Sequence, residues 1–205
     1  MLTHFTNQDI ACLEKRTRTA LVNSLSGFKS LNLIGSVNKS GQINLAIFNS
    51  VMHIGADPAL MGFISRPDSV DRHTLENIKE TGYYTINHVH TEIFEKAHQT
   101  SARYGREESE FDAAGLGAEY KDAFSAPFVQ ESRIQIGLSL KEIVPVRINN
   151  TLLVVGEITD LYFPGDIWDA GQGIFDFEKA GTVAGSSLDG YHATHLIKRL
   201  KYAKP

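Results

Sequence analysis

Hydrophobic and polar positions change their spacing several times along the chain. Apolar side chains recur every three or four residues from Ile10 to Leu25, after Thr6 as a helix cap and before Ser26-Gly27 as a stop. This spacing predicts one amphipathic helix at the amino-terminal end. Its apolar stripe needs cover, either from the rest of the same chain or from a second copy.

Beyond this helix, the spacing becomes the two-residue alternation that is typical of β-strands. Predicted strands cover residues 31–37, 42–48, 51–55, 60–65, 83–89, 134–144 and 152–163. The first four are joined by short turns, which favours antiparallel neighbours. A short helix is predicted between Asp71 and Gly82, and two more over 91–101 and 109–114, outside the sheet.

The order of these elements favours one mainly β domain over residues 1–205, with an N-terminal helix and a C-terminal extension. A chain of 205 residues with 42% hydrophobic side chains can bury one substantial core. Internal repeats, low-complexity tracts and Ser/Pro-rich linkers are missing from the sequence, which argues against a second domain.

Charge and cysteine content exclude several classes of partner. The net charge of −4 leaves no basic stripe for a phosphate backbone, so we expect no nucleic acid partner. Cys12 is the only cysteine, which rules out an intramolecular disulfide and suits a reducing cytosol. No run approaches the roughly 18 apolar residues of a membrane span. We therefore expect a cytoplasmic protein that does not enter a membrane.

Familiar nucleotide and nucleophile motifs are missing. Gly115-Leu116-Gly117 and Gly171-Gln172-Gly173 lack the third glycine and the strand-to-helix setting of a dinucleotide fold. Walker A and G-x-S-x-G patterns do not occur in the sequence. His88 and His90 place two imidazoles on one strand face, but two ligands without a third are a weak basis for a metal. No metal site is predicted.

A series of modest motifs runs from the first hairpin to Asn87. Its members, in chain order, are Gly41 with Asn44 and Ser50, then Pro58, Phe63–Pro67, Arg72–Thr74 with Asn77, and Thr81-Gly82 with Asn87. In this order the segment resembles the FMN-binding split-barrel, flavin reductase-like family. Gly190-Tyr191-His192 is similar to a C-terminal element of many members. The chain departs from the family in the long, insert-like Glu92–Glu131 region and in Arg72-His73, where a lysine is frequent.

The resemblance implies a six-stranded antiparallel Greek-key split barrel with peripheral helices that binds FMN. It also implies a homodimer with its FMN sites near the subunit interface. Hydride would pass from NAD(P)H to the flavin, which needs close stacking rather than an acid, base or nucleophile, so no catalytic side chain is assigned. A flavin-dependent monooxygenase or another electron acceptor would be the partner.

Two other functions remain open on the same fold. One is a pyridoxamine phosphate oxidase-like enzyme, which uses FMN to oxidise an amine. The other is a non-enzymatic flavin-binding electron carrier that a partner protein reduces.

Residues at the start of the predicted helix between Asp71 and Gly82 suit the FMN phosphate. Arg66, Arg72, His73 and Thr74 would combine cations with the unpaired amides of a helix start. The alternative is that Asp71 or Thr74 merely caps this helix and that the arginines are solvated.

The isoalloxazine ring needs an apolar slot and polar groups along one edge. The end of the second predicted strand suits this need with Asn44, Ala46, Ile47, Phe48, Asn49 and Ser50. The alternative is an ordinary strand end with turn-forming polar residues.

Four further residues are candidate cofactor contacts with structural alternatives. Asn77 and Asn87 would contact the cofactor or satisfy the nearby backbone. Tyr191 and His192 would fold over the flavin or the nicotinamide, or pack the C-terminal segment onto the barrel. Trp168 would lie in a mobile lid or in a packed loop.

Overall fold

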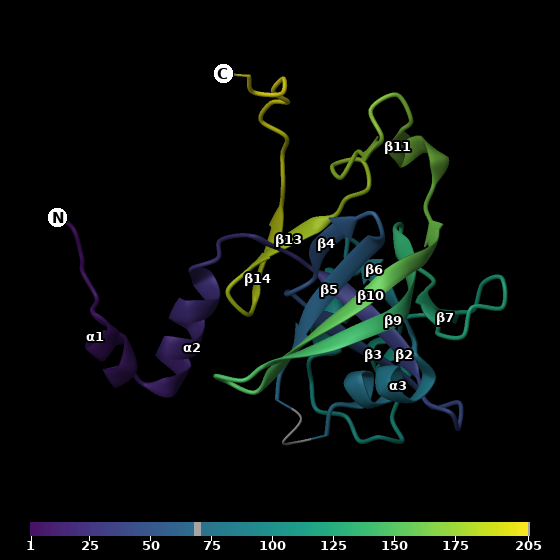
Figure 1. The fold of residues 1–205 in the computed structure, drawn as a ribbon, viewed down its shortest axis with the longest axis horizontal. Coiled ribbons are helices and arrows are strands. Elements are labelled where there is room, and N and C mark those ends of the chain that lie inside the picture. The colour runs from purple at the N-terminus through teal and green to yellow at the C-terminus, as the bar shows by residue number, and fades with distance from the viewer. Residues whose placement is uncertain (68–70, 205) are drawn as a thin grey trace.

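A seven-stranded antiparallel sheet forms the body of the protein in the computed structural model, which describes residues 1–67 and 71–204 (Figure 1). Its strands are β2 (Asn32–Val37), β3 (Ile43–Phe48), β4 (Met52–Ala56), β5 (Ala59–Ser65), β6 (Tyr83–His88), β9 (Gln135–Val146) and β10 (Thr151–Tyr162). They pair in the order β3-β2-β6-β9-β10-β5-β4, always antiparallel. The mainly β class and the strands expected from the alternation are confirmed.

The sheet differs in strand count from the six strands that the family resemblance implied. The seventh arises because β4 pairs with β5 across a tight turn and extends the edge of the sheet. Short strands form three smaller sheets: β1 (Lys29–Ser30) with β13 (Val183–Ser186) and β14 (Gly190–Ala193), β7 (Ala118–Glu119) with β8 (Phe128–Val129), and β11 (Trp168–Asp169) with β12 (Ile174–Phe175).

Alternation along β2 and β3 creates two cores, one on each face of the sheet. Ile34 joins the inner cluster, which includes Phe63 and Tyr84. Its neighbour Leu33 and the β3 residue Leu45 face the outer cluster. The helices α4 (Phe94–Gln99) and α5 (Glu110–Ala114) cover this outer cluster. These helices lie outside the barrel, as the sequence predicted.

The prediction of one N-terminal helix is wrong, because the chain forms two helices there. α1 (Asn7–Cys12) ends before Leu13, whose extended backbone breaks the helix. The Glu14 carboxylate then accepts hydrogen bonds from the amides of Arg16 and Thr17 and starts α2 (Lys15–Ser24). Neither helix contains a fully buried residue, and both stand to one side of the barrel (Figure 1).

The two ends of the barrel are closed in different ways. α3 (His73–Thr81) covers one end with Leu75 and Ile78 and stops at Gly82, which has a left-handed backbone. The loop that contains the short helix η1 (Gly165–Ile167) lies over the inner cluster elsewhere. Trp168 packs in this loop at 5.1 Å between ring centroids from Phe175, which favours the packed-loop alternative. In the described residues, no helix is long and apolar enough to cross a membrane.

Asn87 is a fully buried junction between three strands. Its Nδ2 donates to the carbonyl of Leu33 at 3.2 Å and to Thr85 Oγ1 at 2.9 Å. Its Oδ1 accepts from the amide of Val129 at 3.0 Å. The side chain therefore joins β6 to β2 and β8, as the structural alternative for this residue requires.

We predict that Asn87→Ala destabilises the fold. The substitution leaves the buried Val129 amide without its acceptor, so the free energy of unfolding should fall by about 1–3 kcal/mol in urea denaturation. Asn23→Ala, which removes an exposed bond within α2, serves as the control and should change this free energy by less than about 0.5 kcal/mol. Wild-type stability of Asn87→Ala would contradict the structural role.

Candidate functional site

The edge strand β3 and the start of α3 meet through two buried polar side chains. Asn44 Nδ2 donates to Thr74 Oγ1 at 2.9 Å, and both residues are buried. The structure thus brings together a residue predicted for the ring site and a residue predicted for the phosphate site. Asn77, also buried, donates to Ser36 Oγ at 3.2 Å and attaches α3 to β2.

The first turn of α3 has no side-chain cap from the described residues. Arg72 occupies the cap position, and its own amide donates to Glu76 Oε1 at 2.9 Å. The alternative in which Asp71 or Thr74 caps the helix is therefore wrong. Because first-turn amides have no partner within a helix and the helix dipole is positive at this end, the start of α3 favours an anion.

Three basic side chains surround this helix start. Arg66 is exposed at the end of β5, and within residues 1–67 and 71–204 no hydrogen bond or ion pair engages its guanidinium. Arg72 Nε donates to the carbonyl of Pro67 at 3.2 Å. Because Pro67 directly follows Arg66, this bond keeps the two arginines near each other. His73 is half-buried in the first turn. All four predicted phosphate residues therefore lie in one region.

Two carboxylates that the sequence reasoning missed lie close to these cations. Burial opposes charge on Glu76, but hydrogen bonds from the Arg72 amide and from Arg106 outweigh it and hold the pKa of Glu76 below its usual value. Burial raises the pKa of Glu110, although the bond from the Leu45 amide, at 2.9 Å, and nearby His73 lower it. Sequence spacing could have indicated Glu76, because it lies four positions after Arg72, the cap residue of its helix. Only the fold brings Glu110 close to β3 and His73.

Apart from Asn44, the residues predicted for the flavin ring lie farther along β3 and just beyond its end, from Ala46 to Ser50. At about 3.4 Å per residue, the five steps from Asn44 to Asn49 span about 17 Å. Asn49 Nδ2 donates to the carbonyl of Ser187 at 3.3 Å. Ser50 Oγ accepts from the Ile64 amide at 3.1 Å and donates to the Ile64 carbonyl at 3.2 Å, which fastens the end of β3 to β5.

The backbone of β3 has one free edge, because β3 is the last strand of the sheet. The Leu45 amide points to this edge, where it meets Glu110. Backbone groups alternate along a strand, so the amide and carbonyl of Ile47 also point to the free edge. Ala46, Ile47 and Phe48 are half-buried, and Phe48 packs on Phe63 with ring centroids 4.9 Å apart.

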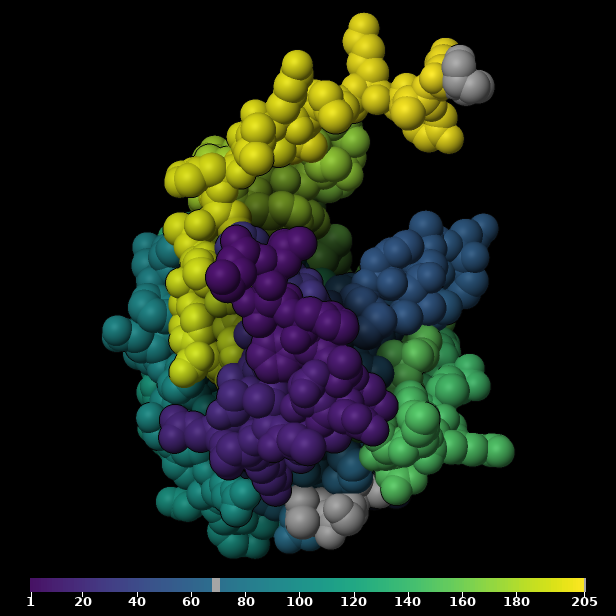
Figure 2. All heavy atoms as spheres, turned by 90° about the vertical axis from the view of Figure 1, so that its left-hand side faces the viewer, coloured from purple at the N-terminus to yellow at the C-terminus, as the bar shows by residue number. Residues whose placement is uncertain are grey.

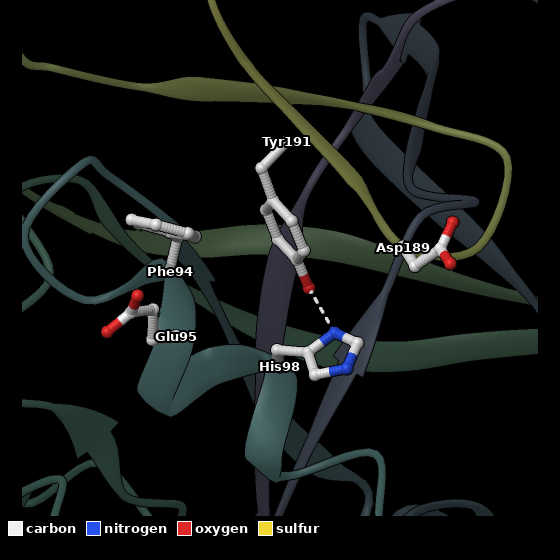
Figure 3. Close-up of a pocket in the computed structure, with 5 residues that line it drawn as sticks. All are labelled: Phe94, Glu95, His98, Asp189 and Tyr191. Atoms are coloured by element: carbon white, nitrogen blue, oxygen red, sulfur yellow. Dashed lines mark hydrogen bonds between the residues drawn. The ribbon is translucent and has the colours of Figure 1, made fainter.

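Tyr191 and His192 on β14 both have side-chain partners within the fold. The Tyr191 hydroxyl lies 2.8 Å from His98 Nδ1, and its ring lies 5.3 Å from that of Phe94 (Figure 3). His192 Nε2 lies 2.7 Å from Ser186 Oγ, and its ring lies 4.7 Å from that of Phe28. These contacts favour the packing alternative for both residues.

Two surface pockets are lined mostly by residues outside the predicted site. One of about 260 Å³, which we call the aromatic pocket, is lined by Phe94, Glu95, His98, Asp189 and Tyr191. The other, of about 590 Å³, is lined by residues that include Lys121, Arg133 and Tyr162. Tyr191 is the one predicted site residue that lines either of these two pockets.

The two histidines considered for a metal are engaged separately. His88 stacks on Phe177 at 6.1 Å between ring centroids, and burial lowers the pKa of His88 to about 4. His90 Nε2 lies 2.9 Å from the carbonyl of Glu131. Across the described part of the chain, no group of three or more His, Cys, Asp or Glu residues could hold a metal.

The fold matches solved structures over nearly the whole chain. A split-barrel protein of Shewanella frigidimarina NCIMB 400, described as a candidate flavin reductase, is 50% identical, with a TM-score of 0.94 over 98% of this chain and 100% of that one. Nitrilotriacetate monooxygenase component B of Bacillus cereus is 17% identical, with a TM-score of 0.86 over 98% of this chain and 99% of that one. At 17% identity, the likeness shows the fold alone.

Sequence comparison covers less of each relative but identifies the family. An uncharacterized protein of Aquifex aeolicus is 27% identical over 120 residues, which are 58% of this chain and 61% of that protein. The match thus spans less than two thirds of that relative. Residues 25–176 match the model of the flavin reductase like domain. Since this match covers most of the chain, the protein belongs to the flavin reductase-like family, and it has the split-barrel fold.

Proposed function

We propose that the protein binds FMN along the free edge of β3 and that NAD(P)H reduces the bound flavin. The observation that carries this proposal is the uncapped start of α3 beside Arg66, Arg72 and His73, with Thr74 held against β3 by Asn44. Unpaired amides, a helix dipole and guanidinium groups together suit a phosphate monoester.

The length of β3 supports the placement of the rest of the cofactor. An extended ligand whose phosphate lies at the start of α3 can follow the strand to residues 46–50. There the free backbone groups of Ile47 suit the polar edge of the flavin ring. Asn49 and Ser50 would support this end indirectly, since their side chains already hold the backbone of neighbouring segments.

The side chains of the site bind and orient rather than transfer protons. The flavin supplies the hydride chemistry, so the protein needs to hold two rings in contact and keep water away. Component B of a monooxygenase shares this fold, which makes a flavin-dependent monooxygenase our proposed electron acceptor. No charged side chain is assigned a catalytic role.

Anaerobic addition of NADH or NADPH to FMN-loaded protein tests the reductase activity. We expect one equivalent of at least one nicotinamide cofactor to bleach the flavin absorbance. If both cofactors leave the flavin oxidised while pyridoxamine phosphate reduces it, the oxidase alternative is correct. If none of the three reduces it, the protein is an electron carrier and the reductase proposal is wrong.

The phosphate site makes a specific prediction for Arg66→Ala. Loss of a charge-assisted hydrogen bond should weaken FMN binding by about 1.5–3 kcal/mol in a fluorescence titration, with unchanged thermal stability. Wild-type protein should prefer FMN to FAD, because no dinucleotide motif is present to hold an adenosine half. Arg103→Ala, which also removes an exposed arginine, is the control and should leave the FMN affinity unchanged. Equal affinities of the two variants would place Arg66 on the solvated surface.

We also propose a homodimer in which the second copy covers the open site. Several segments that carry exposed apolar side chains lie on the face shown in Figure 2, where α2, the β4–β5 hairpin and the tip of the β9–β10 hairpin are all visible. The exposed side chains on these segments are Val22, Leu25, Met52, Ile54 and Ile148. An apolar surface of this kind is typical of a subunit interface.

Light scattering at micromolar concentration should therefore give the mass of a dimer for FMN-loaded protein. Ile54→Glu should give a monomer that retains little FMN, because a charge would be buried at the interface. Tyr120→Glu places the same charge at an exposed aromatic residue beside β7, which lies away from α2 in Figure 1, and should remain a dimer. A monomeric wild-type protein with flavin fully bound would contradict the shared site.

A further inference from the structure

The aromatic pocket lies on the outer face of the sheet, where Phe94 and Tyr191 pack against the cluster that also includes Ile47. Phe94, Glu95 and His98 belong to α4, whereas Tyr191 lies on β14 and Asp189 in the turn before it (Figure 3). The pocket therefore forms where two segments that are about ninety residues apart in the sequence meet. Packing against the outer cluster accounts for Phe94 and Tyr191, but not for the two carboxylates beside them.

Three aromatic rings form the walls of the aromatic pocket in a fixed arrangement. The Tyr191 ring is tilted by 48° against Phe94 and stands edge-on to His98 with centroids 5.7 Å apart. The 2.8 Å hydrogen bond between the Tyr191 hydroxyl and His98 Nδ1 fixes both rings. In Figure 3, the Tyr191 ring lies between Phe94 on one side and Asp189 on the other. Aromatic faces are therefore exposed without being free to turn.

The charge of the aromatic pocket is negative. Glu95 and Asp189 are exposed, and among the residues that the structure describes neither carboxylate has a hydrogen-bond or ion-pair partner. Lys96, the residue next to Glu95, instead donates to the carbonyl of Gly115. None of the five residues that line the pocket is a lysine or arginine. Burial and the charge of Asp189 both raise the pKa of Tyr191, which agrees with a negative local potential.

We propose that the aromatic pocket binds a small organic cation, an alkylammonium group or a pyridinium ring. Aromatic faces attract cations through their quadrupoles, and the two carboxylates add a direct attraction while they repel anions. A volume of about 260 Å³ suits a ligand of a few heavy atoms. The cation would come from an alkylamine metabolite or from the pyridinium ring of an oxidised nicotinamide cofactor.

Binding of matched cationic and neutral probes tests this proposal without any flavin reaction. Titration by nuclear magnetic resonance would compare choline with the isosteric alcohol in which carbon replaces nitrogen, and the 1-methylnicotinamide cation with nicotinamide. At least one cation should bind about tenfold more tightly than its neutral counterpart. Tighter binding of choline assigns an alkylammonium ligand, and tighter binding of 1-methylnicotinamide assigns a pyridinium ligand. Equal binding of cation and neutral isostere in both pairs would overturn the proposal.

Charge removal locates the binding in the aromatic pocket. The double variant Glu95→Gln with Asp189→Asn should weaken cation binding about tenfold, whereas Glu142→Gln, an exposed carboxylate on β9, should not change it. The double variant should bind FMN as the wild type does. A failure of the flavin proposal would therefore be distinguishable from a failure of the cation proposal. Undiminished cation affinity in the double variant would contradict a site at these residues.

Discussion

The hydrogen bond from Asn44 to Thr74 is the constraint on which the proposed site depends. The bond is buried, so its loss would leave two polar groups without a partner and shielded from water. It also fixes the edge strand β3 to the first turn of α3. Thr74 lies in the first turn, and Arg72, at the cap position, supplies no side-chain cap. The first-turn amides therefore have no side-chain partner at the cap, and Arg72 is held near Arg66 through Pro67. A single side-chain contact thus aligns the phosphate region with the strand that leads to the ring region.

An exposed sheet edge is usually a liability, since unpaired backbone groups can pair with other chains. The protein covers one part of the β3 edge with Glu110, which accepts from Leu45, and leaves the Ile47 groups open. We interpret the open part as the place where a ligand takes over the role of a neighbouring strand. The exposed apolar side chains on α2 and β4 lie on segments outside the packed core, which agrees with a site that a second copy completes.

Local sequence signals predicted most of the fold, because period-two alternation and turn residues are properties of short segments. They predicted the strands that became β2 to β6, and the stop of α3 at Gly82. They failed at the N-terminal helix, where the apolar spacing continues through Leu13 although Glu14 starts a new helix. The roles of Glu110 and Tyr191 could not be predicted, since their partners Leu45 and His98 are far away in the sequence and meet them only after folding. His192 pairs with nearby Ser186, but its ring contact with Phe28 also forms only in the folded chain. Asn87 shows the same limit, because its motif position is compatible with both a cofactor contact and a strand junction.

The central claim is that the start of α3 holds the phosphate of the flavin. The most direct measurement compares the affinities of FMN and riboflavin, which differ only in this phosphate, for the wild type and for Arg66→Ala. The account predicts that the wild type binds FMN at least about tenfold more tightly than riboflavin, and that this ratio falls toward one in the variant while riboflavin affinity is unchanged. Equal affinity of the wild type for FMN and riboflavin, or a ratio that Arg66→Ala leaves intact, would contradict it.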